Sequence, residues 1–179
     1  MANESKIIDS SPGHLIRRLQ QIAVAIFMTE TEKFNITPVQ YSALLAINLN
    51  PSIDQTALAN TIAYDRATIG SVVEKLERKK LIKRAAGVRD RRAKHLIITP
   101  NGRRLLREIG PVVETTQQLI LAPLRPSERQ LFTGVLKRLV HSNNSRSRAP
   151  LRMARSGSEV KAPRIPRRRR PGAGLRPSG

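Results

Sequence analysis

A short basic segment near the middle of the chain carries the side chains best suited to bind a polyanion. It holds three arginines and one carboxylate in four consecutive positions, at Arg89, Asp90, Arg91 and Arg92. Guanidinium groups bind phosphate through paired hydrogen bonds, and arginine is attracted to the negative potential of a narrow DNA minor groove. Because a nearby carboxylate can fix a guanidinium in one orientation, we expect Asp90 to aim Arg92. Arg89 and Arg91 would then meet phosphate. A solvated basic loop with an incidental ion pair is the alternative interpretation.

Two strand-like stretches flank this segment, at residues 81–87 and 94–99. Their apolar and β-branched residues predict the two arms of a hairpin. A hairpin that follows a DNA-reading helix is called a wing, and its tip can reach the minor groove.

The residues before the hairpin predict a helix with two different faces, capped by Asp65. The apolar positions recur on one side, at Ile69, Val72, Val73 and Leu76. The other side carries small hydroxyl residues and then bases, at Thr68, Ser71, Lys75 and Arg78.

A shorter helix capped by Asp54 precedes this one, so the pair predicts a helix-turn-helix. We expect Thr68, Ser71 and Lys75 to face the major groove, and Arg66 to lie near phosphate.

Four further helices are predicted outside this pair. The first runs from about His14 to Lys33, and the second begins at Pro38 with Thr37 as its cap. A long helix follows the Thr-Pro-Asn-Gly sequence at residues 99–102 and runs to about Leu121, and a last helix carries Leu131, Val135 and Leu139 in line. The terminal helices have wide apolar stripes that need a partner to cover them.

The charge of the chain favours an anionic partner. The formal net charge is +20, and residues 141–179 hold 11 of the 33 bases and one of the 13 acids. The first 140 residues are therefore also basic, which favours nucleic acid first and an anionic membrane second. We divide the chain into a flexible N-terminus at 1–11, a domain at 12–142, and a basic tail at 143–179 that is too poor in apolar residues to fold alone.

Catalytic and metal-binding chemistry finds little support in the sequence. The chain has no cysteine, which excludes disulfides, thiolate catalysis and cysteine-type zinc sites. Its three histidines, at 14, 95 and 141, lack metal-ligand spacing, and no Gly-rich phosphate loop or nucleophile elbow is present. We expect no cofactor and no enzymatic activity. No apolar run is long enough to span a membrane, and no signal peptide is recognisable, so we expect a cytoplasmic protein.

The run DRATIGSVVEKLERKKLIKRAAGVRDRRAKHLIITPNG resembles the MarR family of winged-helix transcription regulators. The match rests on the Asp-x-Arg at Asp90 to Arg92, on the Thr-Pro-x-Gly at Thr99 to Gly102, and on the ITPVQ sequence at residues 36–40. It covers residues 12–142, and Lys80 departs from it, since many members have glycine there. The resemblance implies a mainly α fold, a winged helix-turn-helix with N- and C-terminal dimerisation helices and a small β-wing. It also implies a homodimer whose two lobes bind successive major grooves of a pseudo-palindromic operator.

The first helix carries residues that could hold a small carboxylate. His14, Arg17 and Arg18 lie beside its apolar stripe, and cations at a helix start oppose the helix dipole. The stretch PGHLIRRLQQIAVAIF resembles the subgroup associated with aromatic and nicotinate-type catabolism, which implies an aromatic acid as effector. Tyr41 could close such a pocket, or it could belong to the core. Surface or intersubunit ion pairs are the alternative role for the two arginines.

Together these features predict a ligand-responsive, sequence-specific repressor that is relieved by a small aromatic carboxylate, such as a hydroxylated nicotinate or benzoate. The alternative is a non-specific architectural DNA-binding protein, which the tail and the charge favour. A third hypothesis is a small-molecule carrier or enzyme that uses the His14 and Arg18 pocket without coupling to DNA. Specific and non-specific DNA binding differ in the ratio of operator affinity to random-DNA affinity.

Overall fold

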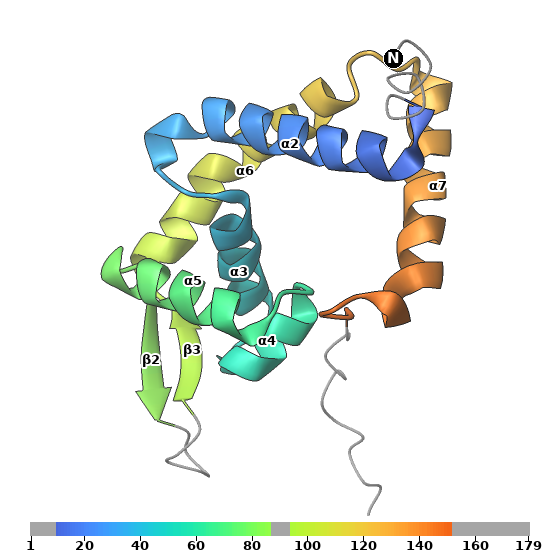
Figure 1. Ribbon diagram of the computed structural model, residues 1–179. Helices are drawn as coiled ribbons and strands as arrows, with labels where there is room; N and C mark the ends of the chain where they lie inside the picture. The colour runs from blue at the N-terminus through green and yellow to red at the C-terminus, as the bar shows by residue number, and fades with distance from the viewer. Residues whose placement is uncertain (1–9, 87–93, 152–179) are drawn as a thin grey trace, which may run out of the picture.

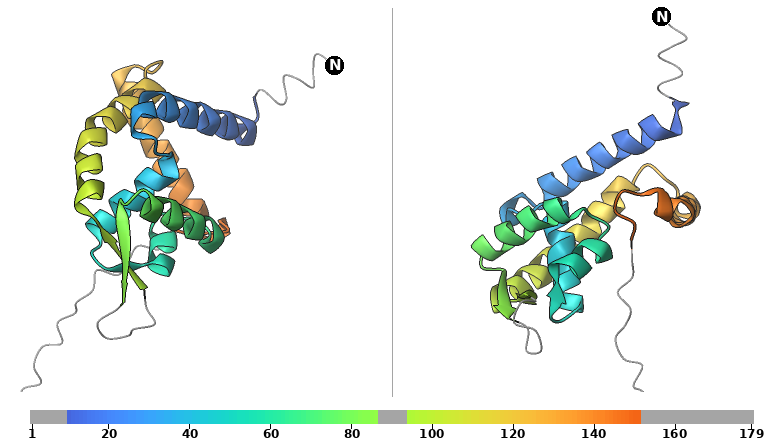
Figure 2. Two further views of the ribbon diagram at one scale, coloured as in Figure 1. Left: turned by 90° about the vertical axis from the view of Figure 1, so that its left-hand side faces the viewer. Right: turned by 60° about the horizontal axis from the view of Figure 1, so that its bottom comes forward.

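The computed structural model describes residues 10–86 and 94–151. Figure 1 shows helix α2 across the top, α7 at the right, α3, α4 and α5 below α2, and the strands β2 and β3 at lower left. The other views also place these strands at the end of the molecule away from α2 (Figure 2). The elements follow the order α2 (Pro12–Glu30), η1 (Glu32–Phe34), α3 (Pro38–Leu49), β1 (Ile53–Asp54), α4 (Gln55–Thr61), α5 (Arg66–Arg78), β2 (Ile82–Ala86), β3 (Lys94–Ile98), α6 (Pro100–Ile120), α7 (Pro126–Asn143) and η2 (Asn144–Arg146).

Four helices begin at the residues that the sequence predicts. In each case the side-chain oxygen of the cap accepts a hydrogen bond from the backbone N–H three residues later, which satisfies a donor that has no partner inside the helix. The four caps are Thr37 for α3, Asp54 for α4, Asp65 for α5 and Thr99 for α6. Local hydrogen bonding therefore explains where these helices start.

The first helix ends earlier than predicted. We expected it to reach Lys33, but α2 stops at Glu30. Thr31 is fully buried, and both its backbone N–H and its hydroxyl donate to the carbonyl of Phe27, at 2.9 and 2.7 Å. The chain then turns through a short 3-10 helix to Asn35, which has a left-handed backbone with φ 48°.

The sheet has three antiparallel strands in the order β1-β3-β2. The predicted hairpin arms correspond to β2 and β3, which pair from Ile82 opposite Ile98 to Ala86 opposite Lys94. The two-residue strand β1 was not predicted, and it pairs with the outer side of β3 through Ile53 and Leu96. The sheet is thereby tied to the segment that leads into α4.

One core lies among α3, α4, α5 and the sheet, and α6 closes it through Ile109. The largest side chains that are fully buried include Leu44, Leu58, Ile69 and Leu96. Burying a side chain of this size stabilises the fold by about 1.5–3 kcal/mol relative to leaving it in water. The core therefore holds α5 and the strands in a fixed relation.

The outer helices are much less buried. Along α2, Phe27 is the one buried residue, and α7 has none. Leu131 and Leu139, which the sequence places in line on the last helix, are 70% and 47% exposed. The apolar stripes of these helices thus remain largely uncovered by the described part of the chain.

Candidate nucleic-acid interface

Helix α5 presents the two faces that its sequence predicts. Ile69, Val73 and Leu76 are fully buried, and Val72 is 4% exposed. On the other side, Ser71, Lys75 and Arg78 are exposed and Thr68 is half-buried. The helix is therefore anchored along one side and offers hydroxyl groups and cations to solvent along the other.

The hydroxyl groups on the exposed face are already oriented by the helix start. The two oxygens of the Asp65 carboxylate accept from the backbone N–H of Thr68 at 2.8 Å and from its hydroxyl at 2.6 Å. These hydrogen bonds, the hydroxyl first, lower the pKa of Asp65. The Ser71 hydroxyl donates to the Thr68 carbonyl at 2.9 Å. Both hydroxyl oxygens keep lone pairs that can accept a further hydrogen bond.

The turn between α4 and α5 is tight. Ala63 adopts a left-handed backbone with φ 55°, and the N–H of Tyr64 donates to the Ala59 carbonyl at 3.0 Å. This is a Schellman turn that ends α4, and Asp65 caps α5 directly after it. Two helices joined in this way form the predicted helix-turn-helix.

Helix α5 ends in a second Schellman turn. The N–H of Lys80 donates to Glu77 at 2.8 Å, and the N–H of Leu81 donates to Leu76 at 3.0 Å. Lys80 has φ 57°, a conformation that glycine adopts without strain. This explains why many members of the resembled family have glycine at this position.

An ion pair joins α5 to the first strand of the hairpin. The Arg84 guanidinium lies 3.1 Å from the Glu77 carboxylate, and both side chains are about a third exposed. The expected wing residues Arg89, Asp90, Arg91 and Arg92 lie outside the described residues. The strands on either side of them are the predicted arms.

The Thr-Pro-x-Gly sequence closes the base of the hairpin. The Thr99 hydroxyl lies 2.8 Å from the Lys80 carbonyl and 3.0 Å from the Leu81 carbonyl, and it accepts from the N–H of Gly102 at 3.1 Å. A Cβ on Gly102 would meet the Leu81 carbonyl oxygen at 2.3 Å. The motif therefore joins the end of β3 to the chain between α5 and β2.

The candidate ligand residues are not gathered into one site within the chain. His14, Arg17 and Arg18 lie near the start of α2, and Arg18 donates to Gln21 at 3.2 Å. Tyr41, half-buried on α3, packs on Phe27 near the far end of α2, with ring centroids 6.1 Å apart. The helical rise from His14 to Phe27 is about 20 Å.

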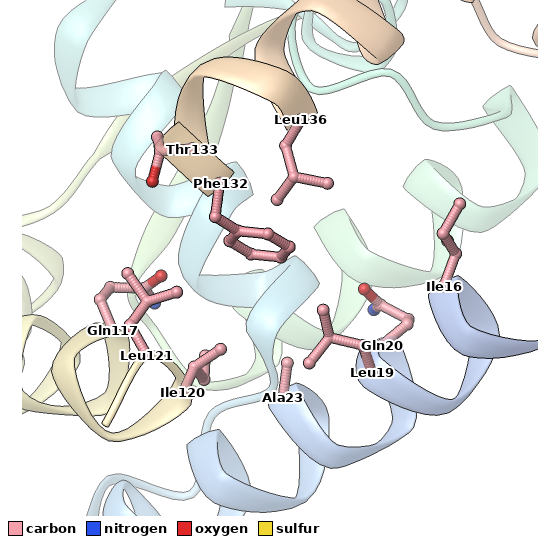
Figure 3. Close-up of a pocket in the computed structure, with 10 residues that line it drawn as sticks. All are labelled: Ile16, Leu19, Gln20, Ala23, Gln117, Ile120, Leu121, Phe132, Thr133 and Leu136. Carbon is pink, nitrogen blue, oxygen red and sulfur yellow. The ribbon is translucent and has the colours of Figure 1, made fainter. Parts of the chain in front are cut away.

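A different cavity lies along α2, and the sequence reasoning missed it. It measures about 380 Å³ and lies between α2, α6 and α7 (Figure 3). Its lining is mostly apolar and consists of Ile16, Leu19, Gln20, Ala23, Gln117, Ile120, Leu121, Phe132, Thr133 and Leu136. The repeat of Ile16, Leu19 and Ala23 on one side of the first helix was the available signal.

Within the described ranges, no group of three His, Cys, Asp or Glu side chains is placed to hold a metal ion. None of the helices described is long and apolar enough to cross a membrane.

Comparison with known proteins identifies the family. The family model described as MarR family matches residues 34–93. The chain is 38% identical over 133 residues to a candidate transcriptional regulatory protein for the hcr operon of Thauera aromatica, covering 74% of this chain and 80% of that protein.

Two solved structures have the same fold. One is that of Bordetella bronchiseptica BpsR, whose DNA binding is regulated by 6-hydroxynicotinic acid, with 31% identity, a TM-score of 0.69, and coverage of 73% of this chain and 93% of that one. The other is the transcriptional repressor CouR bound to a 23-mer DNA duplex, with 26% identity, a TM-score of 0.69, and coverage of 74% and 94%. The predicted mainly α winged-helix fold is confirmed, and this chain belongs to the MarR family of transcription regulators.

Proposed function

We propose that this protein is a sequence-specific DNA-binding repressor that acts as a homodimer and releases DNA when it binds a small aromatic carboxylate. The outer face of α5 carries this proposal, because a helix packed along its other side offers Ser71 and Lys75 to solvent beside the half-buried Thr68. Hydroxyl groups let a helix approach base edges closely and bond them adaptably, so these residues read bases in the major groove.

The charge of the protein supports the DNA-binding part of the proposal. The net charge of +20 attracts a phosphate backbone, and Arg66 at the exposed start of α5 is assigned to phosphate. In the wing, Arg92 enters the minor groove with Asp90 as its orienting partner, while Arg89 and Arg91 contact phosphate. The similarity to CouR, which has been solved with a DNA duplex, supports the same mode of binding.

The uncovered apolar side chains support the homodimer. Leu15 and Ile16 on α2 are 51% and 55% exposed, and Leu131 and Val140 on α7 are 70% and 63% exposed. Exposed apolar side chains gathered on two helices in this way are typical of a surface that a second copy covers. A two-fold dimer then presents two α5 helices to successive major grooves of a pseudo-palindrome.

The effector part of the proposal assigns the aromatic acid to His14, Arg17, Arg18 and Tyr41. His14 contacts a ring substituent, and one of the two arginines pairs with the carboxylate. Since α2 separates His14 from Phe27 and its neighbour Tyr41 by about 20 Å within a protomer, residues of both protomers line the site in this proposal. The similarity to BpsR, which responds to 6-hydroxynicotinic acid, supports this class of ligand.

In vitro selection tests the function. The full-length chain selects duplexes from a randomised pool, and the affinity of the best duplex is compared with that of random DNA at one salt concentration. A repressor binds the selected duplex typically 10³–10⁷ times more tightly. A ratio near one favours the architectural DNA-binding alternative. Failure to bind DNA at all, with intact ligand binding, favours the carrier hypothesis.

A further inference from the structure

The C-terminal end of α5 carries a cluster of cations, and one of them differs from the others in its hydrogen bonds. Lys75 and Arg78 lie in the last turn of the helix, and Lys79 and Lys80 follow them. The Lys79 ammonium donates to the backbone carbonyl of Asn35 and, at 3.2 Å, to the side-chain oxygen of Gln40. Lys79 therefore binds two acceptors within the chain, which lie 44 and 39 residues earlier in the sequence.

Both acceptors are held firmly. Asn35 ends the η1 turn in a left-handed conformation, with its N–H donating to Glu32 at 2.9 Å. Gln40 is 5% exposed, and its backbone N–H is fixed by the Thr37 cap. Asn35 is exposed, but its backbone is fixed by the turn, and Gln40 is buried, so the Lys79 side chain joins the end of α5 to two anchored positions before and in α3.

The surroundings of Lys79 oppose its charge, which argues that the hydrogen bonds hold it in place. Desolvation first, and then the neighbouring Lys75, lower the pKa of Lys79. Lys79 remains exposed, and its two oxygen acceptors replace part of the water that hydrates a free lysine ammonium.

One acceptor, Asn35, belongs to the segment that joins α2 to α3, and the other, Gln40, lies in the first turn of α3. The joining segment, residues 31–37, is anchored by the buried Thr31 and Ile36. The last turns of α2 are anchored by Phe27, which packs on Tyr41 of α3. Lys79 thus connects the end of α5 to the point where the long outer helix α2 enters the core.

We propose that Lys79 is a positioning residue, which fixes α5 relative to α2 and α3 by bonding to Asn35 and Gln40, and that it contacts no DNA phosphate. This inference rests on the proposed DNA-binding function. It gives Lys79 a role different from that of the neighbouring cation Lys75, which lies on the face of α5 assigned to DNA.

Replacement of each lysine in the full-length chain tests the inference. The variants are Lys79→Met and, as the matched control four residues earlier, Lys75→Met. The probes are a duplex selected by the wild-type chain and a random duplex, each titrated over a range of salt concentrations. We expect Lys79→Met to weaken binding of the selected duplex about five- to tenfold, the effect of removing one net hydrogen bond, with an unchanged salt slope and unchanged random-DNA affinity. Lys75→Met should instead change which base pairs the protein prefers, because Lys75 is assigned to base edges in the major groove.

A double-mutant cycle with Gln40→Met separates positioning from charge. If Lys79 acts through Gln40, the effects of Lys79→Met and Gln40→Met on affinity are non-additive. A reduced salt slope for Lys79→Met, an unchanged affinity for the selected duplex, or additive effects would each overturn the inference.

Hydrogen exchange without DNA tests whether Lys79 holds the end of α5, independently of the proposed function. Lys79→Met should speed exchange at residues 31–36 and in the last turn of α5, and Lys75→Met should not. Equal exchange in both variants contradicts the connection. If the wild-type chain selects no duplex, the proposed function fails, and the exchange comparison still tests whether Lys79 holds α5.

Discussion

Gly102, in the first turn of α6, lies directly against the backbone of Leu81. A Cβ at position 102 would stand 2.3 Å from the Leu81 carbonyl oxygen and 2.7 Å from the Ile98 side chain. The same Leu81 carbonyl accepts from the backbone N–H of Thr99 at 3.0 Å and lies 3.0 Å from the Thr99 hydroxyl. The carbonyl cannot retreat without breaking these hydrogen bonds, so this glycine sets how closely α6 approaches the base of the wing.

We therefore expect Gly102→Ala to lower the free energy of unfolding by about 2 kcal/mol, the usual effect of forcing a methyl group into a packed site. Gly110→Ala is the control, since it lies in the same helix and an added Cβ there meets no atom within 4 Å. That change should stabilise the protein by about 0.5–1 kcal/mol, because alanine favours a helix over glycine. Urea unfolding at a fixed protein concentration measures both. Equal effects at the two positions would contradict the steric account.

Lys80→Gly should stabilise the protein by about 0.5–1 kcal/mol. Lys80 adopts φ 57°, and a left-handed backbone costs an L-residue roughly 1–2 kcal/mol. Glycine removes this strain, but its greater freedom in the unfolded chain cancels part of the gain in stability. Lys83→Gly, in strand β2, is the control and should destabilise. Thermal unfolding of the three proteins checks the prediction, and a decrease of stability in Lys80→Gly would show that its side chain contributes more than the strain removes.

Arg92→Ala should weaken operator binding strongly, and Asp90→Ala should weaken it less. In the proposed wing Asp90 acts only through Arg92, so the double variant should bind no more weakly than Arg92→Ala alone. Affinities of the four proteins for one selected duplex give the coupling free energy. Additive effects would mean that Asp90 does not orient Arg92.

A small aromatic carboxylate should bind the wild-type protein and release its DNA, and Arg17→Ala or Arg18→Ala should weaken that binding. A tenfold preference for the DNA-incompetent form at each of two sites shifts the equilibrium by about 2.8 kcal/mol, enough to empty an operator held near its midpoint. Calorimetric titration with hydroxylated nicotinates and benzoates measures the binding. Binding that is unchanged in both variants would reject the site, and binding without a change in operator affinity would reject the sensing mechanism.

The parts of the fold that the sequence predicted depend on short-range chemistry. Asp65 accepts from a residue three positions later, and the buried and exposed faces of α5 follow from a helical repeat that is visible in the sequence. The Thr-Pro-x-Gly sequence predicted the start of α6 because Thr99 accepts from the backbone N–H of Gly102, again three positions later.

The parts that were not predicted depend on interactions between distant segments. The bonds from Lys79 to Asn35 and Gln40 join residues 44 and 39 positions apart, and nothing in the local sequence indicates these two acceptors. The two-residue strand β1 exists only because β3 offers it an edge at Leu96 and His95. The early end of α2 follows from the burial of Thr31, which depends on the tertiary packing around it.

The most direct test of the central claim is a comparison of selected DNA sequences for the wild-type chain, Ser71→Ala and Arg66→Ala. If α5 reads the major groove, Ser71→Ala changes which bases the selection prefers, whereas Arg66→Ala weakens binding to all sequences about equally and leaves the preference intact. Selection of the same sequence by wild type and Ser71→Ala, together with an effect of Arg66→Ala confined to one base pair, would contradict the assignment of this face of α5.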